Sequence, residues 1–252
     1  MPSPARDHAR ICRGCWDQMR VPIPIRGPLA FPFRVCGVTQ SKMNPNICTI
    51  CERSFRFVKK QRHISATATI LFADIRGYTA LSERMDPVVL SDIVSAFHGQ
   101  CAQAIWDNDG IVNKQMGDGL MAIFNFPIKI ERHASAAVTA AIGIQQHCAA
   151  ALGELASRHS DLALDGLGVG VGVHTGAVEI GEFSTFRSEF TAIGGAVNMT
   201  ARLESQAAAG EILVSAEAAA AAGDLVAGTP TRTLTLKGID HPVVAHVLNT
   251  VH

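Results

Sequence analysis

The sequence predicts a mixed sandwich of the α/β or α+β class, in which helices cover one face of a β-sheet. Apolar, β-branched stretches alternate with long helical patterns from residue 66 onward, as they do in such sandwiches. Hydrophobic residues make up 48% of the 252 positions and charged residues 17%, a balance that excludes intrinsic disorder and favours a well-filled core. The chain has no run of about 18 or more apolar residues, so we expect no membrane-spanning helix.

The first 62 residues differ from the rest, and we predict two units, an N-terminal module at 1–62 and a body at 63–252. Residues 1–62 contain 12 Lys and Arg against 3 Asp and Glu, a net charge of +9, whereas the body has 10 against 19, a net charge of −9. These opposite charges favour docking of the module on the body, although basic segments also bind nucleic acid or anionic membranes.

The module should be rich in loops, because seven of the chain's 11 prolines lie in its first 45 positions. We expect extended pieces at residues 21–25 and 30–35, followed by a short basic helix at 48–61. The start of the chain carries arginines and lacks the apolar stretch of a secretory signal, so a cytoplasmic location is expected.

The body begins with a buried strand at residues 66–73, which are apolar and β-branched. A helix at 87–106 follows, since its apolar residues recur at helical spacing and Pro87 suits a first helical turn. Residues 110–115 and 120–124 read as two strands joined by a tight turn. The Ala-rich stretch 131–158 has helical spacing and predicts a long second helix.

Glycine alternates with apolar residues at 166–173, which predicts a strand with one face made only of glycine. Such a face lets another backbone or helix approach closely. The segment is not a phosphate-binding loop, because no Gly-Lys-Ser/Thr follows it. The remaining expected elements are a helix at 196–206 and strands at 177–182, 190–193, 211–214, 231–236 and 243–248.

Two carboxylates occupy positions where a binding role competes with a structural one. Asp74 ends the first strand and could cap the next turn or bind a metal ion, with Gly77 allowing a phosphate to approach the backbone. Asp118 lies in a Gly-Asp-Gly turn and, taken alone, is an ordinary turn residue. Together, a strand-end and a hairpin carboxylate suit a two-metal site for phosphoryl transfer.

Four separated motifs occur in order along the chain. They are Leu71-Phe-Ala-Asp-Ile-Arg-Gly-Tyr-Thr79, Lys114-Gln-Met-Gly-Asp-Gly-Leu-Met-Ala-Ile-Phe124, Gly172-Val-His-Thr-Gly176 and Phe190-Thr-Ala-Ile-Gly-Gly-Ala-Val-Asn-Met-Thr-Ala-Arg-Leu-Glu204. This pattern resembles the catalytic domain of class III nucleotidyl cyclases over about residues 65–250, some three-quarters of the chain. The resemblance implies an α+β sandwich around a ferredoxin-like βαββαβ core that works as a homodimer.

The resemblance further implies an adenylate cyclase, which converts ATP to 3′,5′-cyclic AMP and pyrophosphate. Asp74 and Asp118 would hold two Mg²⁺ or Mn²⁺ ions with the carbonyl of Ile75, and these ions would promote attack by the ribose 3′-hydroxyl. Asn198 would position the ribose. Arg202, four residues further along the same helix face, would stabilise charge on the α-phosphate.

The same resemblance places Lys114 and Thr191 at the two purine-selecting positions. Lysine only donates hydrogen bonds and threonine can accept one from an exocyclic amine, so the pair fits adenine. Lys237 matches a family lysine that contacts the terminal phosphates, although a solvated surface lysine is the alternative. Gly195 stands where many relatives have Asp, which should alter the stability of the loop and not the chemistry.

In the resemblance, one protomer supplies Asp74 and Asp118 and its partner supplies the base-reading and helical residues, so a monomer should be inactive. Two other functions remain open. The body could sense ATP without turnover, although its intact site residues count against this. The module could bind nucleic acid with the body as its dimeriser, although it lacks clustered aromatics for stacking.

Two Cys-x-x-Cys pairs lie in the module, Cys12 with Cys15 and Cys48 with Cys51. Each pair can chelate one ion from a tight turn, and four thiolates make a tetrahedral Zn²⁺ site. An iron–sulfur cluster and unliganded thiols are the alternatives, and Cys36 could replace one ligand. A metal would order a segment too short for its own core, which then acts as a regulatory or partner-binding cap or as a structural plug.

The remaining cysteines, Cys101 and Cys148, fall in predicted helices and are expected to be buried small residues. The total of seven cysteines is odd, which argues against a disulfide framework.

Overall fold

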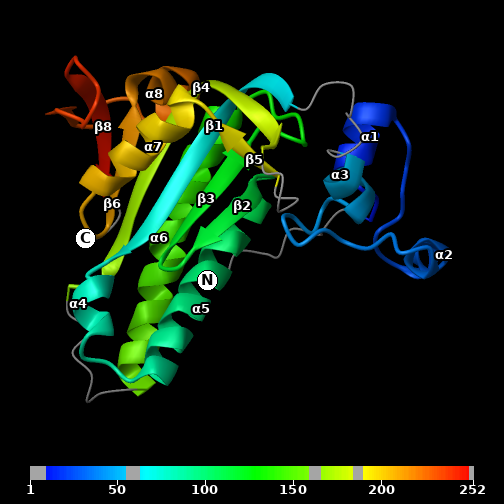
Figure 1. Ribbon diagram of the computed structural model, residues 1–252, viewed down its shortest axis with the longest axis horizontal. Helices are drawn as coiled ribbons and strands as arrows, with labels where there is room; N and C mark the ends of the chain where they lie inside the picture. Colours follow the sequence, from blue (N-terminus) through cyan, green and yellow to red (C-terminus); the bar gives the residue numbers. More distant parts are fainter. Residues whose placement is uncertain (1–9, 55–62, 159–165, 184–189, 250–252) are drawn as a thin grey trace.

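The computed structural model describes residues 10–54, 63–158, 166–183 and 190–249 (Figure 1). The strands of these residues are β1 (His63–Arg76), β2 (Ile111–Met116), β3 (Gly119–Phe124), β4 (Gly168–Glu182), β5 (Phe190–Ile193), β6 (Glu211–Ser215), β7 (Thr231–Leu234) and β8 (Val243–Asn249). The α-helices are α1 (Arg13–Met19), α2 (Phe31–Val35), α3 (Thr49–Ser54), α4 (Tyr78–Ser82), α5 (Pro87–Asp107), α6 (His133–Arg158), α7 (Gly195–Gln206) and α8 (Ala216–Ala222). None of the described helices is both long and apolar enough to cross a lipid bilayer.

The described strands form one sheet in the order β2-β3-β1-β4-β6-β8-β7, with β5 paired to β4. Strands β2, β3, β1 and β4 are antiparallel neighbours, and α5 and α6 connect them along the chain as β1-α5-β2-β3-α6-β4. This order and connectivity are those of a ferredoxin-like core, so the expected α+β fold is confirmed. Only the β4–β6 pair is parallel among these described strands.

One face of the sheet packs on α5, α6 and α8. In β1, Leu71, Ala73 and Ile75 point to this side and join the buried side chains of these helices in one cluster. Helix α5 begins where the sequence predicts, because Asp86 accepts a hydrogen bond of 2.8 Å from the backbone N–H of Val88 and Pro87 occupies the first turn. Helices α5 and α6 lie side by side against the sheet (Figure 1).

The opposite face carries the glycines of β4, and α7 packs directly on them. A Cβ atom added at Gly172 would lie 2.4 Å from the backbone nitrogen of Glu204 and 2.6 Å from the carbonyl oxygen of Thr200. No side chain fits in that space, so the close approach predicted for the all-glycine face is confirmed. Helix α7 is thereby fixed on this face of the sheet.

The described N-terminal residues 10–54, which we call the N-terminal segment, lie against the same face as α7. Ile25 and Ile47 of the segment share one buried cluster with Ile70 of β1 and Ile123 of β3. Figure 1 shows the segment beyond the β2 and β5 side of the sheet. The predicted layer of helices on one face is therefore present, and α7 and the N-terminal segment also cover part of the opposite face.

Several local predictions also differ from the structure. The strands expected at 166–173 and 177–182 are one strand, β4, because the 14-residue β1 pairs with it without interruption from Gly168 to Gly181. Residues 30–35, expected to be extended, form a 3₁₀ turn and α2, in which Pro32 lies in the first turn where its missing N–H costs nothing.

The other differences concern the N-terminal segment and short helices of the body. Residues 21–25 form no described strand beyond an isolated bridge between Pro24 and Ile11. The helix expected at 48–61 is described only as α3, and residues 55–62 lie outside the described residues. Helices α1, α4 and α8 are present where the sequence predicts no helix.

Candidate active site

Asp74 and Asp118 lie side by side at one end of the sheet. Asp74 is near the end of β1 and pairs with Gly119 of β3, so the hairpin turn that carries Asp118 comes directly beside it. The backbone N–H of Ile75 donates a hydrogen bond of 3.1 Å to the carbonyl oxygen of Asp118. The β2–β3 turn is therefore attached to β1 at the position where a paired-carboxylate site is predicted.

Glycine is favoured on both sides of Asp118. A Cβ atom at Gly119 would lie 3.0 Å from Oδ1 of Asp74, so this glycine leaves room for the carboxylate. Gly117 has a φ of 65°, a left-handed conformation that glycine adopts most readily. A hydrogen bond of 2.8 Å between Nε2 of His98 in α5 and the carbonyl oxygen of Gly117 also anchors the turn.

The electrostatic surroundings of Asp74 disfavour its charge. Burial raises the pKa of Asp74 above its ordinary value, the neighbouring charge of Asp118 raises it further, and Arg76 opposes both effects. A bound cation would stabilise the charged form of a carboxylate in these surroundings. Oxygen donors from two acids are also the ligands that Mg²⁺ and Mn²⁺ prefer, so the residues present fit a divalent ion.

Arg76 links the carboxylates to α7, a role that was not predicted. Its guanidinium donates a hydrogen bond of 3.1 Å to Asp74, forms an ion pair with Glu204 and donates a bond of 2.8 Å to the carbonyl oxygen of Ala207. Gly170 makes room for it, since a Cβ there would lie 2.4 Å from Nε of Arg76. The sequence signal that could have predicted this contact is the spacing of two residues between Asp74 and Arg76, which places both side chains on the same face of β1.

The two residues predicted to read the base come from different strands that meet through Asn113. Lys114 is half-buried in β2, where a bulge shifts the register between Val112 and Lys114. The bulge contains Asn113, whose Oδ1 accepts a hydrogen bond of 3.1 Å from the hydroxyl of Thr191 in β5. The side chain of Thr191 is buried. The structure therefore brings strand β5 to the bulge that precedes Lys114.

Helix α7 presents Asn198 and Arg202 away from the sheet. Thr200 and Leu203 of this helix are buried, whereas Asn198 is exposed and Arg202 is half-buried. The guanidinium of Arg202 lies beside Gly238, since a Cβ there would be 3.4 Å from one of its nitrogens. Arg202 therefore lies at the turn that carries the exposed Lys237, and the two predicted phosphate contacts come from neighbouring segments.

The four cysteines of the two Cys-x-x-Cys pairs converge in the N-terminal segment. Their sulfur atoms all lie within 4.8 Å of one another, and all four residues are buried. The Cys15 sulfur lies 3.3 Å from that of Cys51 and 3.5 Å from that of Cys48, and the Cys12 sulfur lies 3.4 Å from that of Cys51. These separations far exceed a disulfide bond of about 2.05 Å and approach the ~3.8 Å between sulfurs at tetrahedral Zn²⁺.

The predicted set of four is thus brought together, and the remaining cysteines are not part of it. Cys36 is exposed and lies outside the cluster, so its predicted use as a replacement ligand is not supported. Cys101 and Cys148 are buried between α5 and α6, as expected for small core residues, with their sulfur atoms 3.9 Å apart.

Comparison with models of protein families identifies the family of the chain. The family model described as the adenylate and guanylate cyclase catalytic domain matches residues 58–250. The chain belongs to this family. The resemblance seen in the sequence motifs is therefore confirmed, and the four-cysteine cluster precedes the matched cyclase domain.

Curated relatives of this cyclase domain are longer proteins. An adenylate cyclase of Anabaena cylindrica is 35% identical over 137 residues, which cover 54% of this chain and 26% of that protein. Adenylate cyclase 1 of Rhizobium meliloti (strain 1021) is 28% identical over 173 residues, which cover 68% of this chain and 25% of that protein. The chain thus spans about a quarter of the length of these two relatives.

Solved structures share the fold of this cyclase domain. The crystal structure of the guanylyl cyclase Cya2 superposes with a TM-score of 0.67 at 31% identity and covers 74% of this chain and 93% of that chain. The adenylyl cyclase CyaB from P. aeruginosa superposes with a TM-score of 0.66 at 28% identity and covers 75% and 97%. Because these two structures are named for different nucleotides, the base must be inferred from the residues themselves.

Proposed function

We propose that this cyclase domain is an adenylate cyclase, which converts ATP to 3′,5′-cyclic AMP and pyrophosphate. The observation that carries the proposal is the pair Asp74 and Asp118, held side by side by the bond from Ile75 N–H to the Asp118 carbonyl. In the reaction the ribose 3′-oxygen forms a bond to the α-phosphorus and its hydroxyl proton passes to solvent water. The bond from the α-phosphorus to the bridging oxygen breaks, and pyrophosphate leaves.

Asp74 and Asp118, with the carbonyl of Ile75, would hold two Mg²⁺ or Mn²⁺ ions per site. The raised pKa of Asp74, caused by burial and then by the charge of Asp118, supports the need for cations there. When bound, such ions supply Lewis acidity and favour loss of the proton from the ribose 3′-hydroxyl.

Side chains of α7 and its neighbouring turn would orient the nucleotide. Asn198, exposed on α7, would hydrogen-bond the ribose. Arg202 would stabilise the charge that develops on the α-phosphate, since a planar guanidinium suits two phosphate oxygens. Lys237 would contact the terminal phosphates, which is supported by the position of Arg202 beside Gly238.

Lys114 and Thr191 would select adenine. Lys114 can only donate a hydrogen bond, which suits the N1 acceptor of adenine. The Thr191 hydroxyl already donates its proton to Asn113, so its lone pairs are available to accept from the 6-amino group. Guanine presents an acceptor and a donor in the opposite order, so ATP is the proposed substrate.

The working form would be a homodimer with two shared sites. One protomer would supply Asp74 and Asp118, and its partner would supply Lys114, Thr191, Asn198 and Arg202. The exposure of Asn198 and Lys237 supports this, because a second surface is needed to cover the ribose and phosphates and exclude water.

Incubation of the purified chain with ATP or GTP and Mn²⁺, followed by detection of cyclic nucleotides, tests the proposal. We expect cyclic AMP to form at least about tenfold faster than cyclic GMP, and Asp118→Ala to lower the rate at least about 100-fold. The matched control is Asp92→Ala, which removes an exposed carboxylate of α5 and should leave the rate unchanged. Binding of ATP without any cyclic product would instead favour the nucleotide sensor.

We also propose that Cys12, Cys15, Cys48 and Cys51 hold one Zn²⁺ ion. Four buried sulfur atoms within 4.8 Å of one another support a tetrahedral thiolate site. Ligation requires reduced cysteines, which agrees with the cytoplasmic location expected from the sequence. Metal analysis should find one zinc per chain, retained in Cys36→Ser and lost in Cys48→Ser, and equal zinc in both variants would contradict the assignment.

A further inference from the structure

The N-terminal segment attaches to the connection between α5 and β2 through two adjacent residues. The carbonyl oxygen of Met43 accepts hydrogen bonds from the backbone N–H of Val112, at 3.0 Å, and from Nε1 of Trp106, at 2.7 Å. The side-chain amide of Asn44 donates a bond of 2.7 Å to the carbonyl oxygen of Gly110. Strand β2 ends the strand order of the described sheet, so Met43 pairs a backbone group on its outer edge.

The loop that carries Met43 and Asn44 is closed immediately before the second cysteine pair. Asn44 is completely buried and accepts bonds from two backbone N–H groups, that of Asn46 at 2.7 Å on its side chain and that of Ile47 at 3.1 Å on its carbonyl. The next residue, Cys48, donates its N–H to the sulfur of Cys12 at 3.1 Å. The geometry of the docking loop therefore depends on the position of the cysteine cluster.

The first cysteine pair holds the same loop from its other side. The N–H of Arg13, which follows Cys12, donates a bond of 2.9 Å to the carbonyl oxygen of Asn46. Arg13 also forms an ion pair with Asp109, in the turn between α5 and β2. Arg13 and Ile47, the residues adjacent to Cys12 and Cys48, thus bind the loop, and Arg13 also binds the turn on which the loop docks.

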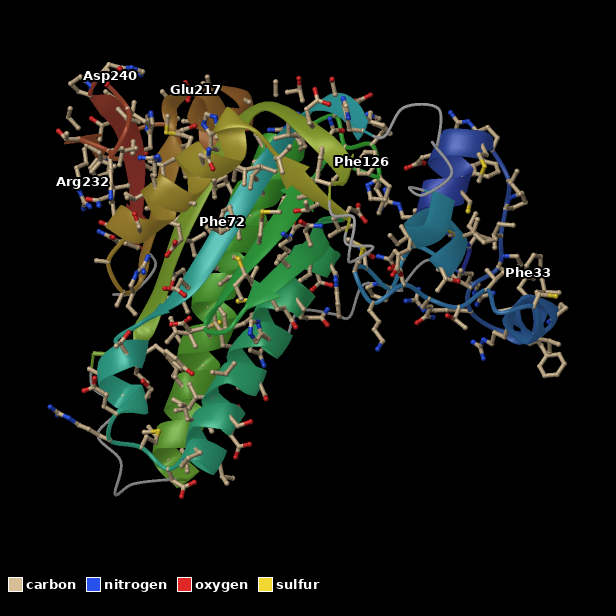
Figure 2. All side chains as sticks on the ribbon, in the orientation of Figure 1. Phe33, Phe72, Phe126, Glu217, Arg232 and Asp240 are labelled. Carbon is tan, nitrogen blue, oxygen red and sulfur yellow. The ribbon has the colours of Figure 1, made fainter. Side chains whose placement is uncertain are left out.

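The described part of the N-terminal segment has little apolar core of its own. Its buried Ile25 and Ile47 belong to a cluster completed by residues of the body such as Ile111 and Phe126. Figure 2 labels Phe126 at the end of the sheet that faces the segment. A short segment of this kind is ordered by cross-links or metal rather than by burial alone, and a Zn²⁺ ion at four thiolates provides such a cross-link.

The docking point lies next to the base-reading part of β2. Val112, which donates to Met43, is followed by Asn113 in the bulge and then by Lys114. Asn113 in turn accepts the hydrogen bond from Thr191. A change in the position of Val112 would therefore also move Lys114 and, through Asn113, Thr191, the two residues proposed to bind adenine.

We propose that Zn²⁺ at the four cysteines holds the N-terminal segment on the edge of β2, and so couples metal occupancy to the binding of the base. The docking part of this proposal rests on the proposed zinc site and not on the cyclase activity, whereas the coupling to the base rests on the proposed function. Loss of zinc releases Met43 and Asn44, leaves the N–H of Val112 and the indole of Trp106 without this acceptor, and loosens the bulge that precedes Lys114.

Trp106 reports the docking without any enzyme assay. The chain has two tryptophans, so Trp16→Phe leaves Trp106 as the single indole. In the full-length Trp16→Phe protein, a zinc-selective chelator should remove one zinc per chain and shift the Trp106 emission to longer wavelength. Added Zn²⁺ should restore it. An unchanged emission after complete zinc loss, or the absence of bound zinc, would overturn the proposal.

Three variants distinguish the effect of zinc loss from general destabilisation of the fold. Cys48→Ser in the Trp16→Phe background should show the shifted emission without chelator, whereas Cys36→Ser, at an exposed cysteine outside the cluster, should match the parent. Asn44→Ala should keep its zinc and still shift the Trp106 emission, because it removes the bond to Gly110 and the loop-closing bond from Asn46 but no metal ligand. Zinc-bound Asn44→Ala with the emission of the parent would contradict the role of this loop.

The coupling to the base is measured with excess Mg²⁺ before and after zinc removal. We expect the KM for ATP to rise at least about fivefold while kcat changes less, because the affected residues bind the base and not the reacting phosphate. An unchanged KM would overturn the coupling even if the docking is confirmed by fluorescence. A protein that binds zinc and responds at Trp106 but makes no cyclic nucleotide would contradict the proposed cyclase function and leave the docking intact.

Discussion

The hydroxyl of Thr191 donates a hydrogen bond of 3.1 Å to Oδ1 of Asn113, and this bond fixes which partner the hydroxyl can offer to a nucleotide. A hydroxyl has one proton and two lone pairs. The carbonyl oxygen of Ala192, at 3.4 Å, is the more distant of two acceptors for this proton. With the proton on the nearer Asn113, the hydroxyl would offer a lone pair to the proposed base. Asn113 is therefore expected to set the preference for adenine through the orientation of its neighbour.

Replacement of Asn113 by leucine should weaken the discrimination between ATP and GTP. Without the acceptor, the Thr191 hydroxyl can rotate and donate to the O6 atom of guanine. We expect the ratio of kcat/KM for ATP over GTP to fall by about tenfold, the worth of one hydrogen bond. Asn113→Asp keeps an oxygen at the same position and should retain the ratio better, and an unaltered ratio in Asn113→Leu would remove Asn113 from base selection.

Mixing two inactive variants should restore activity if the site is shared between protomers. Asp118→Ala lacks a carboxylate and Arg202→Ala lacks the proposed phosphate contact, but a heterodimer of the two has one intact site. Random pairing of equal amounts should recover about a quarter of the wild-type rate, since half of the dimers are mixed and each has one working site. No recovery from variants that still dimerise would place all the residues in one chain.

Removal of Arg76 should destabilise the protein. Arg76 is the ion-pair partner of both Asp74 and the largely buried Glu204, and burial already raises the pKa of Glu204 against the opposing effect of Arg76. We expect Arg76→Met to lower the free energy of unfolding by about 3 kcal/mol, as when one partner of a buried pair is lost. Urea denaturation measures this. The double variant Arg76→Met with Glu204→Gln should regain part of the loss, and a double variant no more stable than the single one would argue against an unpaired charge.

The glycine face of β4 allows a matched comparison of two Gly→Ala changes. Gly172→Ala should lower the free energy of unfolding by about 2–4 kcal/mol, because its Cβ has no space against the backbone of α7. Gly153→Ala lies in α6 with no atom within 4 Å of the added Cβ and should raise stability by about 0.5–1 kcal/mol. Thermal denaturation of the two variants should therefore give shifts of opposite sign.

His174 should make the fold less stable in mild acid. Its Nδ1 lies 2.8 Å from the hydroxyl of Ser215, and burial lowers its pKa against the weaker opposing effect of Glu217. A histidine with a lowered folded pKa contributes stability above its unfolded value of about 6.5, and this contribution is lost as the pH falls from there toward the folded pKa. His133, whose pKa is also lowered by burial, acts in the same direction.

The measurement is the free energy of unfolding at pH 7.5 and pH 5.5 for wild type and His174→Gln. The loss on acidification should be smaller in the variant, because glutamine does not titrate in this range. Equal losses in the two proteins would assign the pH dependence to other groups.

The positions of the site carboxylates could be predicted because strands and turns leave local signals. The apolar run before Asp74 and the Gly-Asp-Gly turn at Asp118 each define a short element, and their order along the chain identified the family. The glycine alternation likewise predicted the approach of a helix to β4, since the absence of side chains on one face of the strand is visible in its local sequence.

Contacts made over long sequence separations could not be predicted in the same way. The bond from Arg76 to Ala207 spans 131 residues, and the bond from Thr191 to Asn113 spans 78. The continuity of β4 through Gly176 likewise depends on its long partner β1, because the local sequence of His-Thr-Gly reads as a break. The base-reading roles and the metal ions at Asp74 and Asp118 remain predictions from the family resemblance.

The attachment of Met43 to Val112 has a practical consequence for work on isolated fragments. A recombinant protein trimmed to residues 58–250, the region matched by the family model, would lack the N-terminal segment and with it the Met43 carbonyl that pairs with the outer edge of β2. An uncovered edge strand offers its free N–H and C=O groups to other molecules, so the trimmed protein is expected to self-associate and lose solubility during purification. Low activity in such a fragment would then reflect aggregation of the trimmed protein rather than a weak enzyme.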